Sequence, residues 1–548
     1  MFIVSAHAIS AVSFGGVMTD RNRSKTCARG ANISGVSRRD ILRMGSVIIP
    51  AGILLPAWLT ARAATAPATF NYYVSPTGSD SNPGTLAAPW AITSLSMLTW
   101  NANNRANWNK LNGTGVSVGF LPGTYDVSSM VGSQESNGCL QFPGGTSTTP
   151  NYFASCNSSG AYSALSATFD MKGASGLFGG KNGSEGPLIA HTGSGPPSGD
   201  PYATGNIIID GLVLTGWSYK GIRVGGLSSA DGPQITGPVT IQNCEFTGGG
   251  HNPGDGLDNA VACWMDGLTN WTVSNNLFLN NAPWAAGSND HLNAIGVGYC
   301  QNGTIQYNTV INAGNIYGKS FGSGTTGTGD EGNILQYNYQ DTSMYTIECY
   351  GLQDFSGYPA PGLTQTTIFR NNIVLATLNG ISAYSATSNW PHGFTTPVEA
   401  YNNTLVMTGG SYAIQIGVSN SSSTTVYNNI STGTVSLVEQ SGGAVAILDY
   451  NLADKSVSGG GSNNITGTPT FVGGTPALPA QAYQLATGSL GKGAGRVGGV
   501  ASGAAIDMGA WGGTDVNTGQ PISQIGYNGS GASTSTPAVP SAPVLTVS

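Results

Sequence analysis

A short motif recurs through the middle of the chain and restricts the folds available to it. The motif reads apolar, any, any, Asn, any, apolar, and its asparagine is Asn276, Asn308, Asn338, Asn372, Asn403, Asn429 or Asn451. Two earlier copies carry Gly211 and Cys244 at that place, and the nine copies are 33, 32, 32, 30, 34, 31, 26 and 22 residues apart. A unit of this length cannot bury its own apolar face, so stacked units must share one core.

Each copy has the composition of a short strand followed by a tight turn. β-Branched and aromatic residues form brief runs bounded by Gly, Asn and Ser, and this content disfavours helix. Asparagine at one fixed place suits stacking, because amides about 4.8 Å apart can donate and accept hydrogen bonds along the stack. Asparagine also tolerates the left-handed backbone of a turn. A β-propeller needs about four strands per 40–45 residues, and these repeats do not follow that pattern. The repeats therefore predict an all-β parallel β-helix with an asparagine ladder.

Motifs at both ends of the repeat region carry a family resemblance. Near the start stand Tyr72–Thr85, which reads YYVSPTGSDSNPGT, and Phe120–Tyr125, which reads FLPGTY. Near the end, Tyr483–Leu485 is followed by Ile506–Ala510, which reads IDMGA. Over about residues 70–512 the chain resembles the right-handed parallel β-helix (pectate-lyase-like) superfamily. The resemblance implies a right-handed solenoid, but this fold hosts lyases, hydrolases, epimerases and adhesins, so it leaves the activity open.

The first stretch of the chain resembles an export signal. Ser37–Arg43 reads SRRDILR, a moderately apolar run follows over 44–59, and small residues follow over 61–66. This order resembles a twin-arginine signal peptide, which predicts a periplasmic or extracellular protein. Pro50 and Pro56 interrupt the apolar run, which makes this run a poor membrane-spanning helix. Once the signal is removed, we expect no membrane span in the remaining chain. The expected organisation is a signal peptide over 1–64, a β-helix domain over 65–512, and a flexible low-complexity tail over 513–548, which is rich in Gly, Ser, Thr, Pro and Ala.

Charge and cysteine content narrow the choice of partners. Without residues 1–64 the chain has 11 basic and 24 acidic residues, a net charge of −13. This sign disfavours nucleic acid and anionic membranes as partners. Six cysteines remain, and an exported protein can form disulfides, with Cys139 and Cys156 as the nearest pair. The sequence leaves the oligomeric state open.

A second strand follows each repeat, and its alternation predicts an outward face. We align Gly221–Val224, Ala260–Cys263, Ala294–Val297, Tyr317–Ser320, Thr346–Cys349, Gly380–Ala383 and Ala413–Ile416. The second and fourth positions then point inward, and the third and fifth face solvent. The third column contains Arg223, Ala262, Gly296, Lys319, Glu348, Ser382 and Gln415. The fifth contains Gly225, Trp264, Gly298, Phe321, Tyr350, Tyr384 and Gly417.

These columns predict a carbohydrate site. Lys319 and Glu348 are expected on adjacent coils about 5 Å apart, as catalytic residues together with Asp290 and His291 from a preceding loop. Sugar rings pack on aromatic side chains, so Trp264, Phe321, Tyr350 and Tyr384, with Arg223, are expected to bind the substrate. Asp255, Asp258 and Asp290 are candidate ligands for Ca²⁺, which would bridge the substrate carboxylate to an acidic groove.

Three functions are compatible with these residues. The first is a polysaccharide lyase acting by β-elimination on a uronate-containing glycan, with Lys319 as the base. The second is a glycoside hydrolase, in which Glu348 would work with Asp290 or Asp258. The third is a non-catalytic glycan-binding or surface β-helix protein. The simpler interpretation of Lys319 and Glu348 is a cross-strand ion pair, and that of the aspartates is ordinary turn residues.

Overall fold

The computed structural model describes most of the repeat region and both of its ends. The described residues are 65–95, 102–127, 140–146, 148–171, 188–191, 206–217, 220–225, 238–249, 260–266, 268–280, 292–298, 300–322, 332–341, 347–354, 366–376, 380–384, 398–410, 412–417, 424–433, 435–440, 447–455, 457, 460–476, 478–516 and 519–529. The proposed signal peptide, residues 1–64, lies outside them. No helix among the described residues is both long and apolar enough to cross a membrane.

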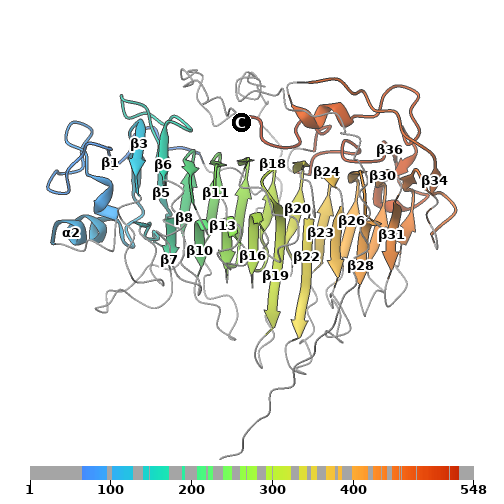
Figure 1. Cartoon of the computed structure of the whole chain (residues 1–548), viewed down its shortest axis with the longest axis horizontal. Coiled ribbons are helices and arrows are strands. Elements are labelled where there is room, and N and C mark those ends of the chain that lie inside the picture. The colour runs from blue at the N-terminus through green and yellow to red at the C-terminus, as the bar shows by residue number, and fades with distance from the viewer. Residues whose placement is uncertain are drawn as a thin grey trace, which may run out of the picture. The chain divides into compact units, whose positions relative to one another are not determined.

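Three long parallel sheets make up the coils (Figure 1). Sheet I contains β1 (Tyr72–Val74), β2 (Ser117–Phe120), β5 (Asn151–Ser155), β8 (Ile207–Asp210), β11 (Val239–Gln242), β14 (Trp271–Ser274), β17 (Thr304–Gln306), β20 (Ile334–Gln336), β23 (Thr367–Arg370), β26 (Val398–Tyr401), β29 (Thr425–Tyr427) and β32 (Ile447–Asp449). Sheet II contains β3 (Gly123–Asp126), β6 (Ala167–Asp170), β9 (Val213–Thr215), β12 (Glu245–Thr247), β15 (Leu277–Leu279), β18 (Thr309–Ile311), β21 (Tyr339–Asp341), β24 (Ile373–Ala376), β27 (Thr404–Met407), β30 (Ile430–Thr432), β33 (Leu452–Ala453) and β34 (Ile465–Thr466).

The third sheet completes each coil. Sheet III contains β4 (Leu140–Gln141), β7 (Leu188–His191), β10 (Lys220–Gly225), β13 (Ala260–Asp266), β16 (Leu292–Gly298), β19 (Asn315–Gly322), β22 (Ile347–Asp354), β25 (Ile381–Tyr384), β28 (Tyr412–Gly417) and β31 (Ser436–Gln440). Within a coil the chain passes from sheet I to sheet II to sheet III, and each strand pairs in parallel with its equivalents in the neighbouring coils. The fold is the expected right-handed parallel β-helix.

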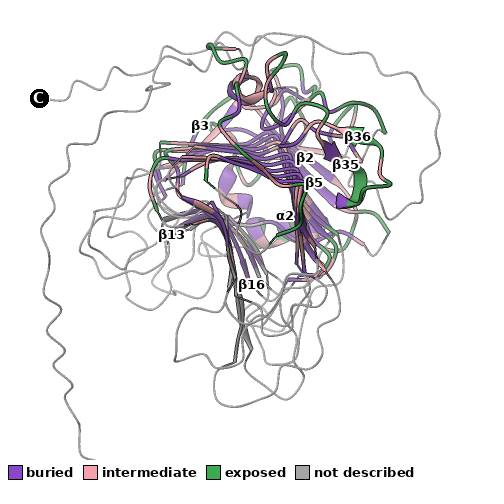
Figure 2. Ribbon diagram, turned by 90° about the vertical axis from the view of Figure 1, so that its right-hand side faces the viewer, coloured by how far each residue is buried: buried purple, intermediate pink, exposed green. Residues whose placement is uncertain are grey.

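The core lies between the three sheets, where buried residues line the strands (Figure 2). In sheet III one inward column holds Ile222, Cys263, Ile295, Ile316, Ile381, Ile414 and Val438, each at most 9 % exposed. In sheets I and II, stacked aromatic side chains fill the same role, as with Phe246 and Phe278, whose ring centroids are 4.7 Å apart. Apolar side chains thus repeat at equivalent positions from coil to coil, and one continuous core results.

The expected asparagine ladder forms at the two-residue turn between sheets I and II. Each ladder amide donates from Nδ2 to Oδ1 of the next, as from Asn276 to Asn308 at 3.0 Å and from Asn308 to Asn338 at 3.1 Å. The series continues through Asn372, Asn403, Asn429 and Asn451 to Asn464, one residue beyond the predicted ladder. The left-handed residue, however, is the one before each ladder asparagine, such as Asn275 with φ 54° and Tyr337 with φ 55°.

The opening motif packs as a cap over the first coil. The Tyr72 and Trp90 rings stack 4.5 Å apart, and Trp90 Nε1 donates to the Asn82 carbonyl at 2.9 Å. A Cβ atom at Gly78 would lie 2.0 Å from the Trp90 carbonyl oxygen, so this close approach requires glycine. Helices η1 (Ile92–Leu95) and α2 (Ala102–Leu111) follow and bury Leu95 and Leu111 in the core.

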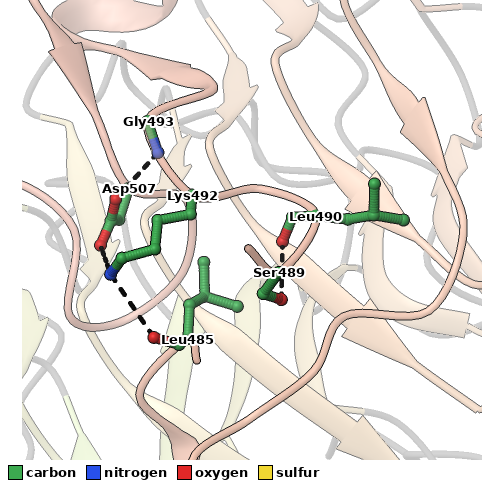
Figure 3. Close-up of polar contacts among 6 residues, drawn as sticks. All are labelled: Leu485, Ser489, Leu490, Lys492, Gly493 and Asp507. Carbon is green, nitrogen blue, oxygen red and sulfur yellow. Dashed lines mark hydrogen bonds and ion pairs between the residues drawn. The ribbon is translucent and has the colours of Figure 1, made fainter. Parts of the chain in front are cut away.

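The closing motif ties the last coils together. Asp507 accepts hydrogen bonds from Lys492 Nζ at 3.0 Å and from the Gly493 amide at 2.8 Å (Figure 3). Helices η4 (Pro479–Tyr483) and η5 (Val497–Gly499) and the antiparallel pair β35 (Gly495–Arg496) and β36 (Ala505–Ile506) lie in the same segment. Gly509 then donates from its amide to the Asn428 carbonyl at 2.7 Å, which anchors this segment on the ladder turn.

Two expectations about the ends and the cysteines are wrong. Residues 513–516 and 519–529, assigned above to a flexible tail, pack on the coils, where Ile525 and Tyr527 are 1 % and 2 % exposed. A Gly- and Ser-rich composition also suits a chain that lies flat over turns, so composition did not distinguish a flexible tail from a packed segment.

Cys156 is a free, buried thiol, so it makes no disulfide with Cys139, which lies outside the described residues.

Candidate functional site

The outer face of sheet III was expected to carry the site, and the observed pairing defines its columns. Since the isoleucine column points into the core, the residues next to it in each strand belong to the outer face. The first outer column contains Arg223, Trp264, Gly296, Tyr317, Glu348, Ser382, Gln415 and Glu439. In the next outer column Lys319 pairs with Tyr350 and Tyr350 with Tyr384. The predicted alignments of Glu348 with Ser382 and of Tyr350 with Tyr384 are therefore confirmed.

The predicted pairing of Lys319 with Glu348 is wrong by two residues. Glu348 pairs with Tyr317, and Lys319 pairs with Tyr350. The reason lies in the core, because Ile316 occupies the inward column that the sequence alignment had given to Gly318. The pairing of β16 with β19 is irregular between Asn293 and Ile295, directly before Ile295 pairs with Ile316. Lys319 and Glu348 remain on neighbouring strands of the same face, staggered by about 6.6 Å along the strand direction.

Trp264 also occupies a different column from the one expected. It pairs with Arg223 on one side and Gly296 on the other, two residues from the predicted alignment. Its half-buried indole lies over Gly296, where a Cβ atom would be 2.3 Å from Trp264 Cε3. Val261 and Cys263 are both apolar, so either could have filled the inward column, and the pattern did not distinguish them. The missing side chain at Gly296 thus makes room for a flat aromatic surface on this sheet.

The predicted aromatic stripe is accordingly divided between columns. Tyr350 and Tyr384 share one column and Trp264 lies in the other, beside Arg223. Phe321 pairs with Gln353 beyond an irregularity that follows Lys319, and so it is out of register with Tyr350. Tyr317, between Gly296 and Glu348, is an aromatic residue of the first column that the shifted alignment missed.

A buried amide at the start of β16 was also missed. Asn293 is fully buried, and among the described residues neither its Oδ1 nor its Nδ2 has a hydrogen-bond partner. It pairs with Val261 and Asn315, two residues before the inward-facing Ile295. Buried amides without partners are rare in native proteins, but the alternation along β16 places Asn293 on the core side of the sheet and not on its outer face. The sequence signal was available, since Asn293 directly precedes the aligned block Ala294–Val297.

The remaining predicted residues lie outside the described part of the chain. These are Asp255, Asp258, Asp290 and His291, all in segments between strands. Within the described ranges no group of three His, Cys, Asp or Glu side chains could hold a metal ion. The suggested Ca²⁺ ligands are thus neither supported nor opposed, and they stay a prediction.

Comparison with known proteins gives structural neighbours only. No protein-family model and no curated protein matches the chain. A solved pectate lyase aligns at 15 % identity over 80 % of this chain and 95 % of its own, with a TM-score of 0.37. A rhamnogalacturonan lyase aligns at 15 % identity over 68 % of this chain and 86 % of its own, with a TM-score of 0.36. The A-module of a mannuronan C-5 epimerase from Azotobacter vinelandii aligns at 12 % identity over 66 % of this chain and 93 % of its own, with a TM-score of 0.32.

Proposed function

We propose that this protein is an exported polysaccharide lyase that acts on a uronate-containing glycan along the outer face of sheet III. The observation that carries the proposal is the Trp264 indole, which lies over Gly296 in the same column as Arg223 and Glu348. A half-buried flat ring on a rigid sheet suits stacking against a sugar, and Arg223 suits its carboxylate. Tyr350 and Tyr384, in register on the next column, extend the aromatic surface along the coils.

In the proposed reaction Lys319 removes the C5 proton of the uronate. The electrons form the C4–C5 double bond, and the bond from C4 to the glycosidic oxygen breaks. The departing oxygen keeps the bonding electrons and takes up a proton from water or from the protonated Lys319. Lys319 must be neutral to act as a base, and it pairs with Tyr350 of the aromatic column on the neighbouring strand. Asp255, Asp258 and Asp290 are proposed to bind Ca²⁺, which would lower the charge of the carboxylate and acidify C5.

Within the described strands of sheet III, the carboxylates besides Glu348 are Asp354, six residues farther along β22, and Asp266 and Glu439, each three strands away. Glycoside hydrolases need two carboxyl groups about 5–10 Å apart. Glu439 shares the column of Glu348 but stands three strands away, which is about 14 Å at the usual strand separation. A hydrolase would therefore need a second carboxylate from a segment between strands, such as Asp290 or Asp258. A non-catalytic glycan-binding protein is the third possibility.

Product analysis on uronate polymers tests the proposal. We expect wild-type protein to generate ultraviolet-absorbing unsaturated ends, and Lys319→Met to lower kcat by about a hundredfold or more. Trp264→Ala should mainly raise KM, because it removes a binding surface. The matched control is Lys492→Met, whose ammonium is exposed and pairs with Asp507 at 3.0 Å, far along the chain. New reducing ends without ultraviolet absorbance would identify a hydrolase, and binding without any product a non-catalytic protein; either result rejects the lyase.

A further inference from the structure

A second candidate site lies on the outer face of sheet I. The residues that end its strands form a polar column, in which Gln306, Gln336, Arg370, Tyr401 and Tyr427 are in register. Gln336 Nε2 donates to Gln306 Oε1 at 2.7 Å, and Arg370 Nε donates to Gln336 Oε1 at 2.7 Å. Arg370 Nη1 donates to the Tyr401 hydroxyl at 2.9 Å. One side of the guanidinium is therefore held in place by neutral groups.

Arg370 has no counter-charge within ion-pair distance in the described part of the chain. It is only 9 % exposed, and a buried arginine normally pairs with a carboxylate. Among the described residues, no Asp or Glu lies within 4 Å of it, and no acceptor receives a hydrogen bond from Nη2. The guanidinium therefore keeps hydrogen-bond donors that no described residue uses.

Glu399 adds an acceptor on the same face. It lies on β26 two residues before Tyr401, the register partner of Arg370, so its side chain is on the outer face of the neighbouring strand. It is half-buried, and burial raises the pKa of its carboxyl while Arg370 lowers it. Arg370 and Glu399 influence each other electrostatically but do not pair directly. A donor and an acceptor on neighbouring strands of one face can contact two different groups of one small ligand.

The surroundings limit what can enter. The Tyr401 and Tyr427 rings stack 4.9 Å apart at an interplanar angle of 3°, and Gly499 packs on Tyr427 so closely that a Cβ atom there would lie 2.6 Å from its Cγ. Each ring therefore covers one face of the other, and Gly499 also packs on Tyr427, while both tyrosines remain only half-buried. Ligand recognition here would use polar groups rather than ring stacking.

We propose that Arg370, Tyr401 and Glu399 form a secondary binding site for an acidic sugar, separate from the outer face of sheet III. The planar carboxylate of a uronic acid would accept hydrogen bonds from Arg370, and its ring hydroxyls would donate to Glu399 and bond with the Tyr401 hydroxyl. The choice of an acidic sugar rests on the proposed function, whereas the need of Arg370 for an oxyanion does not. Such a site would hold a polymer against the coils away from the catalytic strands.

Monosaccharide binding measured by calorimetry or NMR tests this site without any turnover. We expect saturable binding of galacturonate, with galactose and inorganic sulfate each about tenfold weaker. Arg370→Gln should weaken galacturonate binding by about tenfold, and Glu399→Gln should change it by about threefold. The matched control Arg496→Gln removes a guanidinium that lies over the Tyr450 ring instead, and it should leave binding within about twofold.

The outcomes separate this site from the proposed lyase. Trp264→Ala should leave monosaccharide binding unchanged even if it impairs turnover, and a protein without lyase activity that binds galacturonate through Arg370 would still support the site. Equal binding of galacturonate and galactose, or an unchanged Kd in Arg370→Gln, would overturn it. Equal binding of sulfate would reduce it to a simple anion site and also overturn it. If Arg370→Gln lowers the melting temperature strongly, Glu399→Gln decides, and an unchanged Kd there counts against the site.

Discussion

At the scale of single residues, each ladder asparagine forms several hydrogen bonds through one buried side chain. Asn338 is fully buried, donates from Nδ2 to Asn372 Oδ1 and to the Ile305 carbonyl, and accepts at Oδ1 from Asn308. Its Oδ1 also accepts from the Asn308 backbone amide. One amide therefore satisfies backbone groups of the neighbouring coils that would otherwise be buried without partners.

We predict that Asn338→Ala lowers the free energy of unfolding by about 2–4 kcal/mol, because it orphans several buried groups at once. Denaturant unfolding followed by circular dichroism measures the change. Asn464→Ala is the matched control, since Asn464 ends the ladder and is only partly buried. Equal losses in the two variants would contradict a role that depends on burial within the ladder.

Asp341 is a residue whose ionisation opposes folding. It ends β21, and burial raises the pKa of its carboxyl in the native state. The native state then holds this proton at pH values where the unfolded chain has released it. The contribution of Asp341 to stability is thus complete below its ordinary pKa and is lost as pH rises through the raised value.

We predict that Asp341→Asn removes this dependence. The variant should be more stable than wild type at pH 7, and the difference should shrink as pH falls through the raised pKa and vanish below about 4. Unfolding free energies measured across that pH range, in wild type and variant together, give the comparison. Parallel curves for the two proteins would show that Asp341 does not ionise against its surroundings.

At the scale of elements, the most consequential is the C-terminal strap, which we define as residues 505–516 and 519–529. It crosses the ladder turns from later coils to earlier ones (red in Figure 1). Asn371 Nδ2 donates to the Ala510 carbonyl at 2.9 Å, Tyr307 donates to Asp515 at 2.9 Å, and the Asn528 amide donates to Asn275 Oδ1 at 3.2 Å. The left-handed residues before the ladder asparagines thus serve as anchors for the strap.

Truncation tests the contribution of the strap. The reference is a chain that ends at Gly529 and so keeps the whole strap. A chain ending at Gly513 loses the buried Ile522, Ile525 and Tyr527 and should melt about 5 °C lower or more. Differential scanning calorimetry measures both. If removal of 514–529 has no effect, the strap contacts contribute nothing to stability.

At the scale of the whole molecule, the thiols report how completely the core is closed. Cys156, Cys244 and Cys263 are free thiols and fully buried. Burial raises the pKa of Cys156 to about 12 and raises the pKa of Cys244 and Cys263 further above the ordinary thiol value. Because the thiolate is the reactive form, these groups are protonated and inert at pH 8.

We therefore predict that none of these three cysteines reacts with a thiol reagent at pH 8 in the native protein, whereas all three react in denaturant. Labelling followed by peptide mass spectrometry assigns the reaction to each position. Rapid native labelling of Cys263 in particular would mean that the inward face of sheet III opens, and that its register is less fixed than its isoleucine column implies.

The sequence determined the architecture because the repeat is a local pattern with a single spatial solution. Apolar residues and one asparagine recur every 22 to 34 residues, and only stacked coils bring them into contact. The end motifs were equally readable, since Gly78 and Asp507 make contacts within their own segments. Five of the seven aligned segments of sheet III also keep their predicted column, including the pairing of Glu348 with Ser382 and of Tyr350 with Tyr384.

Tertiary structure alone decided the rest. Lys319 and Trp264 moved two residues because Ile316 and Cys263 fill the core column, and a shift of two keeps the same face, so alternation cannot detect it. The strap and the polar column around Arg370 join residues more than thirty positions apart, and no local pattern marks such contacts. The repeat specified which segments stack. The register of each strand was specified by which of its apolar side chains fills the shared core.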